Sequence, residues 1–400
     1  MKRVALSLVL CGLVACGDDD SSDVGADSGA ADSGAVDAAA DSSTDAGPDS
    51  PDVSFDGGRD VVMPSSARER LGLRGPEVVG FRELEVSYER PDGGESRDVR
   101  LLAWYPGSVD EGARPQYTLR QSTVARQDVE AKPGSYPVLM FSHGHQAIPD
   151  ALAYVMEHFA SHGWIVLAPE HTGNTVVDGD ERTTEIYYLR PHDVLASLDF
   201  ALADGFLGGL MGSPRVLSGH SFGGYTAYAL AGASYDVDAI RDGCADESLT
   251  SPICEGLTEE ALMLFDAGFA DDRYDALLAM ASGDFHLFDD FSDVSIPVMQ
   301  MVAENDGHPA GSVGDDDYWN ALDGAGDLRW NLLGGAHNSF TDICVMIPGF
   351  DRCSEQDAAT EIDLVKLFAL AFVRDRLMSD ADAAMVLGEG DELVELTPRE

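Results

Sequence analysis

Residues 219–224, Gly-His-Ser-Phe-Gly-Gly, contain a serine whose surroundings predict nucleophilic chemistry. An apolar run at residues 214–218 predicts a strand before it, and residues 225–231 predict a helix after it. A serine on a sharp strand-to-helix turn has strained backbone geometry and projects its hydroxyl above the sheet. The flanking glycines are needed because side chains there would collide with the neighbouring strand and helix. We therefore expect Ser221 to be a nucleophile, rather than a serine that lies by chance in a glycine-rich turn.

A serine hydroxyl is a poor nucleophile at neutral pH and needs an adjacent base. His337 follows the last predicted strand and two glycines, and we expect it to take the proton of Ser221. The base needs an acid that fixes its tautomer and stabilises the imidazolium. Asp306, just after the penultimate predicted strand, is the favoured acid. Glu304 on the same loop and Asp284 after the preceding strand are the alternatives.

The tetrahedral intermediate of acyl transfer needs two backbone N–H donors. One is expected to be the amide of Phe222, directly after the nucleophile. The other is expected from the loop that follows the predicted strand 137–142, with the amide of His145 favoured and Gly144 giving the bend. The side chains of His143 and His145 suggest a metal pair as an alternative, but no third ligand lies nearby in the sequence. We therefore expect an oxyanion hole here and no metal.

The elements that must position these groups alternate along the chain. Strands are predicted at residues 83–89, 98–105, 137–142, 164–169, 214–218, 276–281, 297–303 and 328–333, and helices at residues 151–162, 190–202, 225–231, 259–269 and 361–378, the last of them strongly amphipathic and closing the domain. Such alternation predicts a mostly parallel sheet with helices on both faces. In these sheets the reactive groups gather at the carboxyl ends of the strands. Ser221, Asp306 and His337 all follow predicted strands.

Taken together, residues 219–224, 142–144 and 337–342 resemble the α/β-hydrolase superfamily, and the resemblance extends over residues 84–378. They are most similar to its platelet-activating-factor acetylhydrolase and dienelactone-hydrolase-like branch, which Arg190 and Asp193, at the opening of the helix before the nucleophile strand, also match. The resemblance implies the α/β-hydrolase fold and a serine esterase that needs neither calcium nor another cofactor. In the first-named enzymes the acid follows the strand after the nucleophile helix, and this keeps Asp284 as an alternative to Asp306.

Several substrates and one other class of function stay open. The expected substrate is a small-molecule, lipid or polymeric ester, because a lipase or a cutinase-like polyester depolymerase shares the same loops. A non-catalytic surface binding protein that retains the hydrolase fold is the alternative from another class. An insertion at residues 235–272, which includes the predicted helix 259–269, is expected either to cap the active site or to pack on the body.

The N-terminus predicts export. Residues 1–15 have a positive start and an apolar stretch too short to span a membrane, which is typical of a signal peptide. Residues 13–16, Leu-Val-Ala-Cys, resemble a bacterial lipobox, and this implies cleavage before Cys16 and its lipidation. Residues 16–64 are rich in Asp, Ser, Ala and Gly, so we expect a disordered tether. By analogy with lipoprotein sorting, the mature protein is expected at the outer membrane or cell surface.

The acidic charge and the cysteines limit the partners and the compartment. The formal net charge is -47, which makes nucleic acid and anionic membrane surfaces poor partners, so the only expected membrane contact is the N-terminal lipid. An exported chain with two close cysteine pairs favours two disulfides, Cys244–Cys254 and Cys344–Cys353. The catalytic domain is predicted at residues 65–380 and an acidic tail at residues 381–400. The oligomeric state is not predicted.

Overall fold

The computed structural model describes residues 66–179, 182–307 and 315–399, all within the compact unit Pro64–Glu400. The predicted signal peptide 1–15, the tether 16–64 and the lipidation site Cys16 lie outside these residues and stay predictions. In the described ranges, none of the helices combines the length and the apolar composition that crossing a membrane requires.

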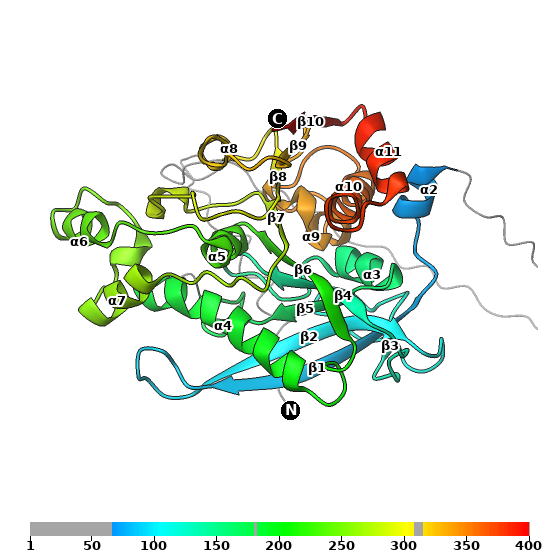
Figure 1. Cartoon of the computed structure of the whole chain (residues 1–400), viewed down its shortest axis with the longest axis horizontal. Coiled ribbons are helices and arrows are strands. Elements are labelled where there is room, and N and C mark those ends of the chain that lie inside the picture. Colours follow the sequence, from blue (N-terminus) through cyan, green and yellow to red (C-terminus); the bar gives the residue numbers. More distant parts are fainter. Residues whose placement is uncertain (1–65, 180–181, 308–314, 400) are drawn as a thin grey trace, which may run out of the picture. The chain divides into compact units, whose positions relative to one another are not determined.

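The described residues form a ten-stranded sheet in the order β10-β9-β8-β7-β6-β4-β5-β2-β1-β3 (Figure 1). Its strands are β1 (Val78–Tyr88), β2 (Arg97–Gly107), β3 (Arg126–Gln127), β4 (Tyr136–Ser142), β5 (Ile165–Pro169), β6 (Met211–His220), β7 (Ala276–Met280), β8 (Val298–Ala303), β9 (Leu328–Leu332) and β10 (Val394–Pro398). Strands β4 to β9 run parallel to one another, whereas β2 and β10 pair antiparallel with β5 and β9. The predicted mostly parallel sheet is therefore confirmed.

Helices cover both faces of this sheet (Figure 1). They are α2 (Ala67–Gly72), α3 (Ala153–Ser161), α4 (Thr184–Ala203), α5 (Phe222–Ala231), α6 (Val237–Ala245), α7 (Glu259–Ala267), α8 (Asp315–Ala321), α9 (Asp342–Met346), α10 (Ala358–Met378) and α11 (Ala381–Glu389), with the 3-10 turns η1 (Pro252–Cys254), η2 (Phe285–Leu287) and η3 (His337–Phe340). Neighbouring residues of β7 enter opposite cores: Leu278 packs in the core that contains α3 and α10, and Leu277 in the core that contains α4 and α5. Burial on both faces explains why the central strands are continuous apolar runs.

The C-terminal part of the chain differs from the sequence-based expectation in two ways. Helix α10 is not strongly amphipathic, because the run from Leu367 to Val373 is buried on successive residues. It lies between the sheet and a second layer formed by α2 and α11, so it has almost no solvent-facing side. The predicted acidic tail 381–400 is wrong for its described residues 381–399. These residues form α11, with Ala383 and Val386 buried, and then β10, which pairs with β9 at the edge of the sheet.

The predicted disulfides Cys244–Cys254 and Cys344–Cys353 are both present, with Cα–Cα distances of 5.3 and 5.6 Å. The first lies in the predicted insertion, between α6 and η1. The insertion packs on the body through α7: the side chains of Leu262 and Phe265 are buried, whereas Met263 between them is 64% exposed. A second attachment is made by Thr184, whose hydroxyl donates to the carbonyl of Glu255 (3.0 Å).

Candidate active site

Ser221 occupies a strained turn between β6 and α5. Its backbone has φ 56° and ψ −121°, a conformation that a non-glycine residue rarely adopts. The neighbouring glycines are required by close packing. A Cβ on Gly219 would lie 2.0 Å from the carbonyl oxygen of Gly223, and a Cβ on Gly223 would lie 1.9 Å from the carbonyl oxygen of Ser142. The sequence therefore folds at this point into the sharp strand-to-helix turn that was predicted.

His337 and Asp306 are hydrogen-bonded to each other at the ends of two neighbouring strands. His337 begins η3 after β9, and Asp306 follows β8. The ring Nδ1 of His337 lies 2.9 and 3.0 Å from the two carboxylate oxygens of Asp306, and both side chains are almost fully buried. A carboxylate only accepts hydrogen bonds, so Nδ1 carries the proton and Nε2 is the basic nitrogen of the ring. The carboxylate thus fixes the tautomer that a general base requires.

The residue before Ser221 connects the strained turn to the loop of His337. Nε2 of His220 lies 2.9 Å from the carbonyl oxygen of His337, and the two rings are 4.9 Å apart. Burial, with a smaller effect of nearby His337, lowers the pKa of His220 to about 3, so its ring is neutral. A neutral ring can donate to this carbonyl from Nε2. This contact places the backbone of His337 beside the turn that carries Ser221.

The two alternative acids contact other groups. The carboxylate of Asp284 accepts hydrogen bonds from Nη1 of Arg182 (3.0 Å) and from the hydroxyl of Tyr187 (3.2 Å). The carboxylate of Glu304 accepts from the backbone N–H of Gly334 (2.7 Å) and so holds the turn that precedes His337. Among the three carboxylates considered from the sequence, the structure brings Asp306 to Nδ1 of His337.

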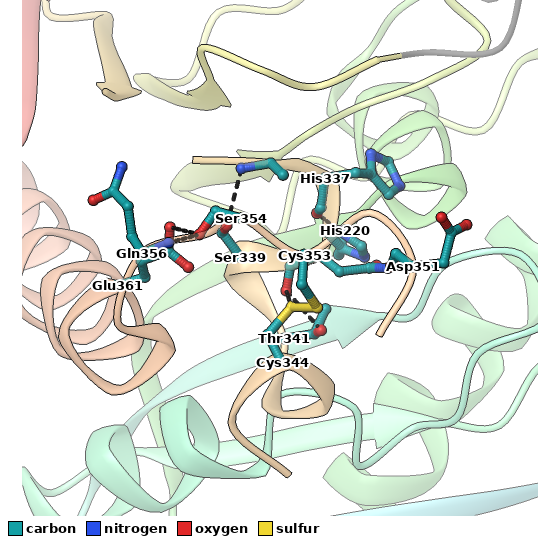
Figure 2. The surroundings of a disulfide bond; sticks show 12 residues. His220, His337, Ser339, Thr341, Cys344, Asp351, Cys353, Ser354, Gln356 and Glu361 are labelled. Atoms are coloured by element: carbon teal, nitrogen blue, oxygen red, sulfur yellow. Dashed lines mark hydrogen bonds between the residues drawn. A yellow bond between two sulfur atoms is a disulfide. The ribbon is translucent and has the colours of Figure 1, made fainter. Parts of the chain in front are cut away.

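The Cys344–Cys353 disulfide lies next to the histidine loop, as Figure 2 shows. Asn338, directly after His337, donates its backbone N–H to the carbonyl of Arg352 (2.9 Å). In turn, Nη2 of Arg352 lies 3.3 Å from Oδ1 of Asp306. The segment closed by the disulfide therefore supports both the histidine and its carboxylate. Arg352 was not predicted as a site residue, and nothing in the sequence around it marks such a role.

The loop after β4 lies directly against Ser221, as the expected oxyanion hole requires. A Cβ on Gly144 would lie 3.2 Å from the Cβ of Ser221. The imidazole of His145 lies 6.5 Å from the ring of Phe222, measured between centroids. Phe222 is the first residue of α5, where backbone N–H groups have no acceptor within the helix. His143 does not face a metal site: its Nδ1 donates to the carbonyl of Gly144 (2.8 Å), and its Nε2 accepts from the N–H of His171 (3.0 Å).

A second hydrogen-bonded serine, histidine and aspartate begin at the end of β4, where this loop starts. Ser142 Oγ is 2.8 Å from Nε2 of His171, whose Nδ1 is 3.0 Å from the carboxylate of Asp193. All three side chains are buried, and Asp193 also pairs with Arg97 (2.7 Å). A buried serine cannot meet a substrate, so this arrangement has a structural role. Arg190 and Asp193 were expected at the opening of a helix, but they lie in the middle of α4 because the helix already begins at Thr184.

The parallel sheet, the helices on both of its faces and the strand–serine–helix turn define an α/β-hydrolase fold. A protein-family comparison matches residues 126–240 to the Chlorophyllase family. The chain is 36% identical over 109 residues to Chlorophyllase-2 of Arabidopsis thaliana, an alignment that covers 24% of this chain and 30% of that protein. The chain thus spans about a third of the length of this curated relative.

A solved structure supports the same fold over most of the chain. The ferulic acid esterase from Streptomyces cinnamoneus matches with a TM-score of 0.56 and 19% identity, covering 80% of this chain and 93% of that chain. The predicted α/β-hydrolase fold is confirmed, and the platelet-activating-factor acetylhydrolase branch stays a prediction. The family match includes Ser221 and His145 but ends before Asp306 and His337, so the pairing of these last two residues rests on geometry alone.

Proposed function

We propose that the protein is a serine hydrolase that cleaves carboxylic esters through an acyl-enzyme, with Ser221, His337 and Asp306 as its triad. One observation carries the proposal: the Asp306 carboxylate holds Nδ1 of a buried histidine, and the backbone of that histidine is joined to the residue before a strained serine. Strain of this kind at a non-glycine residue persists only where the surroundings impose it, and it clusters at active sites.

In the proposed reaction, Nε2 of His337 takes the Ser221 proton while the serine oxygen forms a bond to the ester carbonyl carbon. The negative charge that develops on the carbonyl oxygen is held by the N–H groups of Phe222 and His145. His337 then gives its proton to the departing alcohol as the ester C–O bond breaks. Water, deprotonated by the same ring, then forms a bond to the acyl carbon, and the ring returns the proton to the Ser221 oxygen as the acyl-enzyme C–O bond breaks and the acid leaves.

The names of the two similar proteins support the proposal of ester hydrolysis. One is named as a chlorophyllase and the other as a ferulic acid esterase. The test uses the purified protein with p-nitrophenyl acetate and butyrate, and a fluorophosphonate probe followed by peptide mass spectrometry. We expect turnover of at least one ester and covalent labelling at Ser221. A protein that shows neither turnover nor labelling would instead support a non-catalytic binding protein.

We further propose that the protein is an exported lipoprotein held at the outer membrane or cell surface through Cys16. The signal-like residues 1–15, the lipobox-like residues 13–16 and the acidic segment that follows support this proposal. Replacing Cys16 with serine should release the protein from the membrane fraction into the soluble one, because two or more acyl chains anchor a protein firmly. Fractionation and immunoblotting of both forms measure this effect. Retention of the C16S form in the membrane would rule out the proposed anchor.

A further inference from the structure

Arg190 is a buried cation beside the proposed oxyanion hole. It lies in the middle of α4 and its side chain is 0% exposed. Burial lowers the pKa of Arg190 to about 9, which still leaves the guanidinium charged at neutral pH. Keeping a charge away from water is expensive unless its N–H groups are satisfied. The hydrogen-bond partners of Arg190 therefore indicate the role of this buried charge.

On one side, Arg190 holds the loop that follows β4. Its Nη2 donates to the backbone carbonyl of His143 and also lies 3.2 Å from Oγ of Ser142. Its Nη1 donates to the side-chain oxygen of Asn174 (2.7 Å). The amide nitrogen of the same asparagine lies 2.8 Å from Nδ1 of His145. The guanidinium is thus joined to His145 in two ways: through the backbone of His143, two residues earlier in the loop, and through the side chain of Asn174.

On the other side, Arg190 holds the nucleophile helix. Its Nε donates to the hydroxyl of Thr226 (3.1 Å), which in turn donates to the carbonyl of Phe222 (3.2 Å). The guanidinium carbon also lies 4.7 Å from the centre of the Phe222 ring, within the range of a cation–π contact. One rigid fork of donors therefore reaches both elements whose backbone amides form the oxyanion hole.

Other donors occupy the carboxylate that follows Arg190 in α4. Asp193 lies one turn further along α4, but its oxygens accept from Arg97 (2.7 Å), from Tyr88 (2.8 Å) and from Nδ1 of His171 (3.0 Å). The described contacts of the Arg190 guanidinium are consequently with uncharged acceptors and with the Phe222 ring. Its placement serves the loop and the helix rather than a salt bridge.

We propose that Arg190 is the positioning residue of the oxyanion hole, and that Asn174 transmits its position to His145. The inference rests on the proposed function, because it assigns the amides of His145 and Phe222 to the oxyanion. Because Arg190 fixes both amides before the substrate binds, the activation free energy does not include the reorientation of these amides. The residue itself need not touch the substrate.

The test removes the two connections separately. Asn174→Ala removes the bridge between Arg190 and His145 but leaves the contacts of Arg190 with His143 and with the nucleophile helix. Arg190→Met removes the whole fork while keeping an unbranched apolar side chain. Ser161→Ala is the matched control, because this buried hydroxyl donates to the carbonyl of His158 (2.7 Å) in α3, on the opposite face of the sheet. For each variant we would measure the Tm, kcat and KM for p-nitrophenyl butyrate, and Ki for a trifluoromethyl ketone, whose serine adduct carries an oxyanion.

We expect Asn174→Ala to lower kcat by about tenfold and Arg190→Met by about 100-fold, since losing one oxyanion donor costs about 100- to 1,000-fold. KM should stay within about threefold, because substrate binding does not use the oxyanion. Ki should rise by the same factor as kcat/KM falls, because the inhibitor adduct carries an oxyanion as the transition state does. Ser161→Ala should show a lower Tm with kcat unchanged. If Arg190→Met does not fold, Asn174→Ala decides the question.

Two results would overturn the inference while leaving the esterase proposal intact. One is that the wild type is active and that kcat of Asn174→Ala equals kcat of Ser161→Ala. The other is a fall in kcat without a matching rise in Ki, which would mean that the loss does not arise at the oxyanion. A wild type that neither turns over esters nor is labelled at Ser221 would remove the proposed function, and this inference with it.

Discussion

Replacing Ser221 with alanine should lower ester hydrolysis by about 10⁴-fold or more and abolish fluorophosphonate labelling. Removing the nucleophile of a serine triad costs about 10⁶-fold in kcat, and the activity that remains comes from the oxyanion hole and from binding. The protein should stay folded, with a similar far-UV circular dichroism spectrum. At a φ of 56° alanine is as strained as serine, so the substitution adds no large conformational penalty. Steady-state kinetics and mass spectrometry of the labelled protein measure both effects.

The matched control for this variant is Ser142→Ala. Ser142 belongs to a hydrogen-bonded serine–histidine–aspartate chain with distances of 2.8 and 3.0 Å, but its hydroxyl is buried. Judged by its residue types and hydrogen-bond distances alone, Ser142 would be a rival nucleophile to Ser221. We expect Ser142→Ala to keep labelling at Ser221 and to lose less than about tenfold in kcat, since it removes a support rather than the nucleophile. Labelling that survives in S221A would contradict the proposed nucleophile.

The sequence predicted the nucleophile turn and the central strands well because their signals are local. The strand before Ser221, the glycines around it and the helix after it lie within about 20 residues of one another. Continuous apolar runs such as that in β7 are typical of strands buried on both faces, and both faces are indeed covered. Packing constraints on Gly219 and Gly223 also follow from their place in the turn.

The C-terminal region could not be predicted in the same way because its structure depends on distant partners. Periodicity over residues 361–378 describes which side chains are apolar, but it does not show that α2, from the start of the domain, covers the outer side of α10. The acidic composition of residues 381–400 suggested a solvated tail. The burial of Ala383, Val386 and Val394 arises from pairing with β9 and from packing on α10, neither of which leaves a local signal.

The supports of the candidate site were also beyond the sequence. Arg352 contacts Asp306 from within the segment that the Cys344–Cys353 disulfide closes, and Arg190 reaches two separate elements from the middle of a helix. Such contacts join residues 36 to 48 positions apart, so no motif contains them. For the same reason, the order of residues along the chain left Asp284 as an alternative to Asp306. Only the position of Nδ1 of His337 distinguishes the two carboxylates.

Asp306→Asn should therefore lower kcat by about 10⁴-fold, whereas Asp284→Asn should lower it by less than about tenfold. An asparagine at position 306 can donate its amide N–H to Nδ1 of His337. This stabilises the tautomer with the proton on Nε2, which cannot accept the proton of Ser221. An asparagine at position 284 loses the ion pair with partly exposed Arg182 but can keep its hydrogen bond to Tyr187. Steady-state kinetics with p-nitrophenyl butyrate compare the two variants.

The comparison is sharp because both substitutions preserve shape and remove one negative charge. A general loss of negative charge near the site would slow both variants alike, and so would a general loss of stability. The kcat values of the two variants differ by several orders of magnitude only if one of the two carboxylates holds the histidine. The reverse ranking, with Asp284→Asn the slower variant, would move the acid to the loop after β7. The Asp306–His337 hydrogen bond of 2.9 Å would then be a structural contact, as the Asp193–His171 pair is.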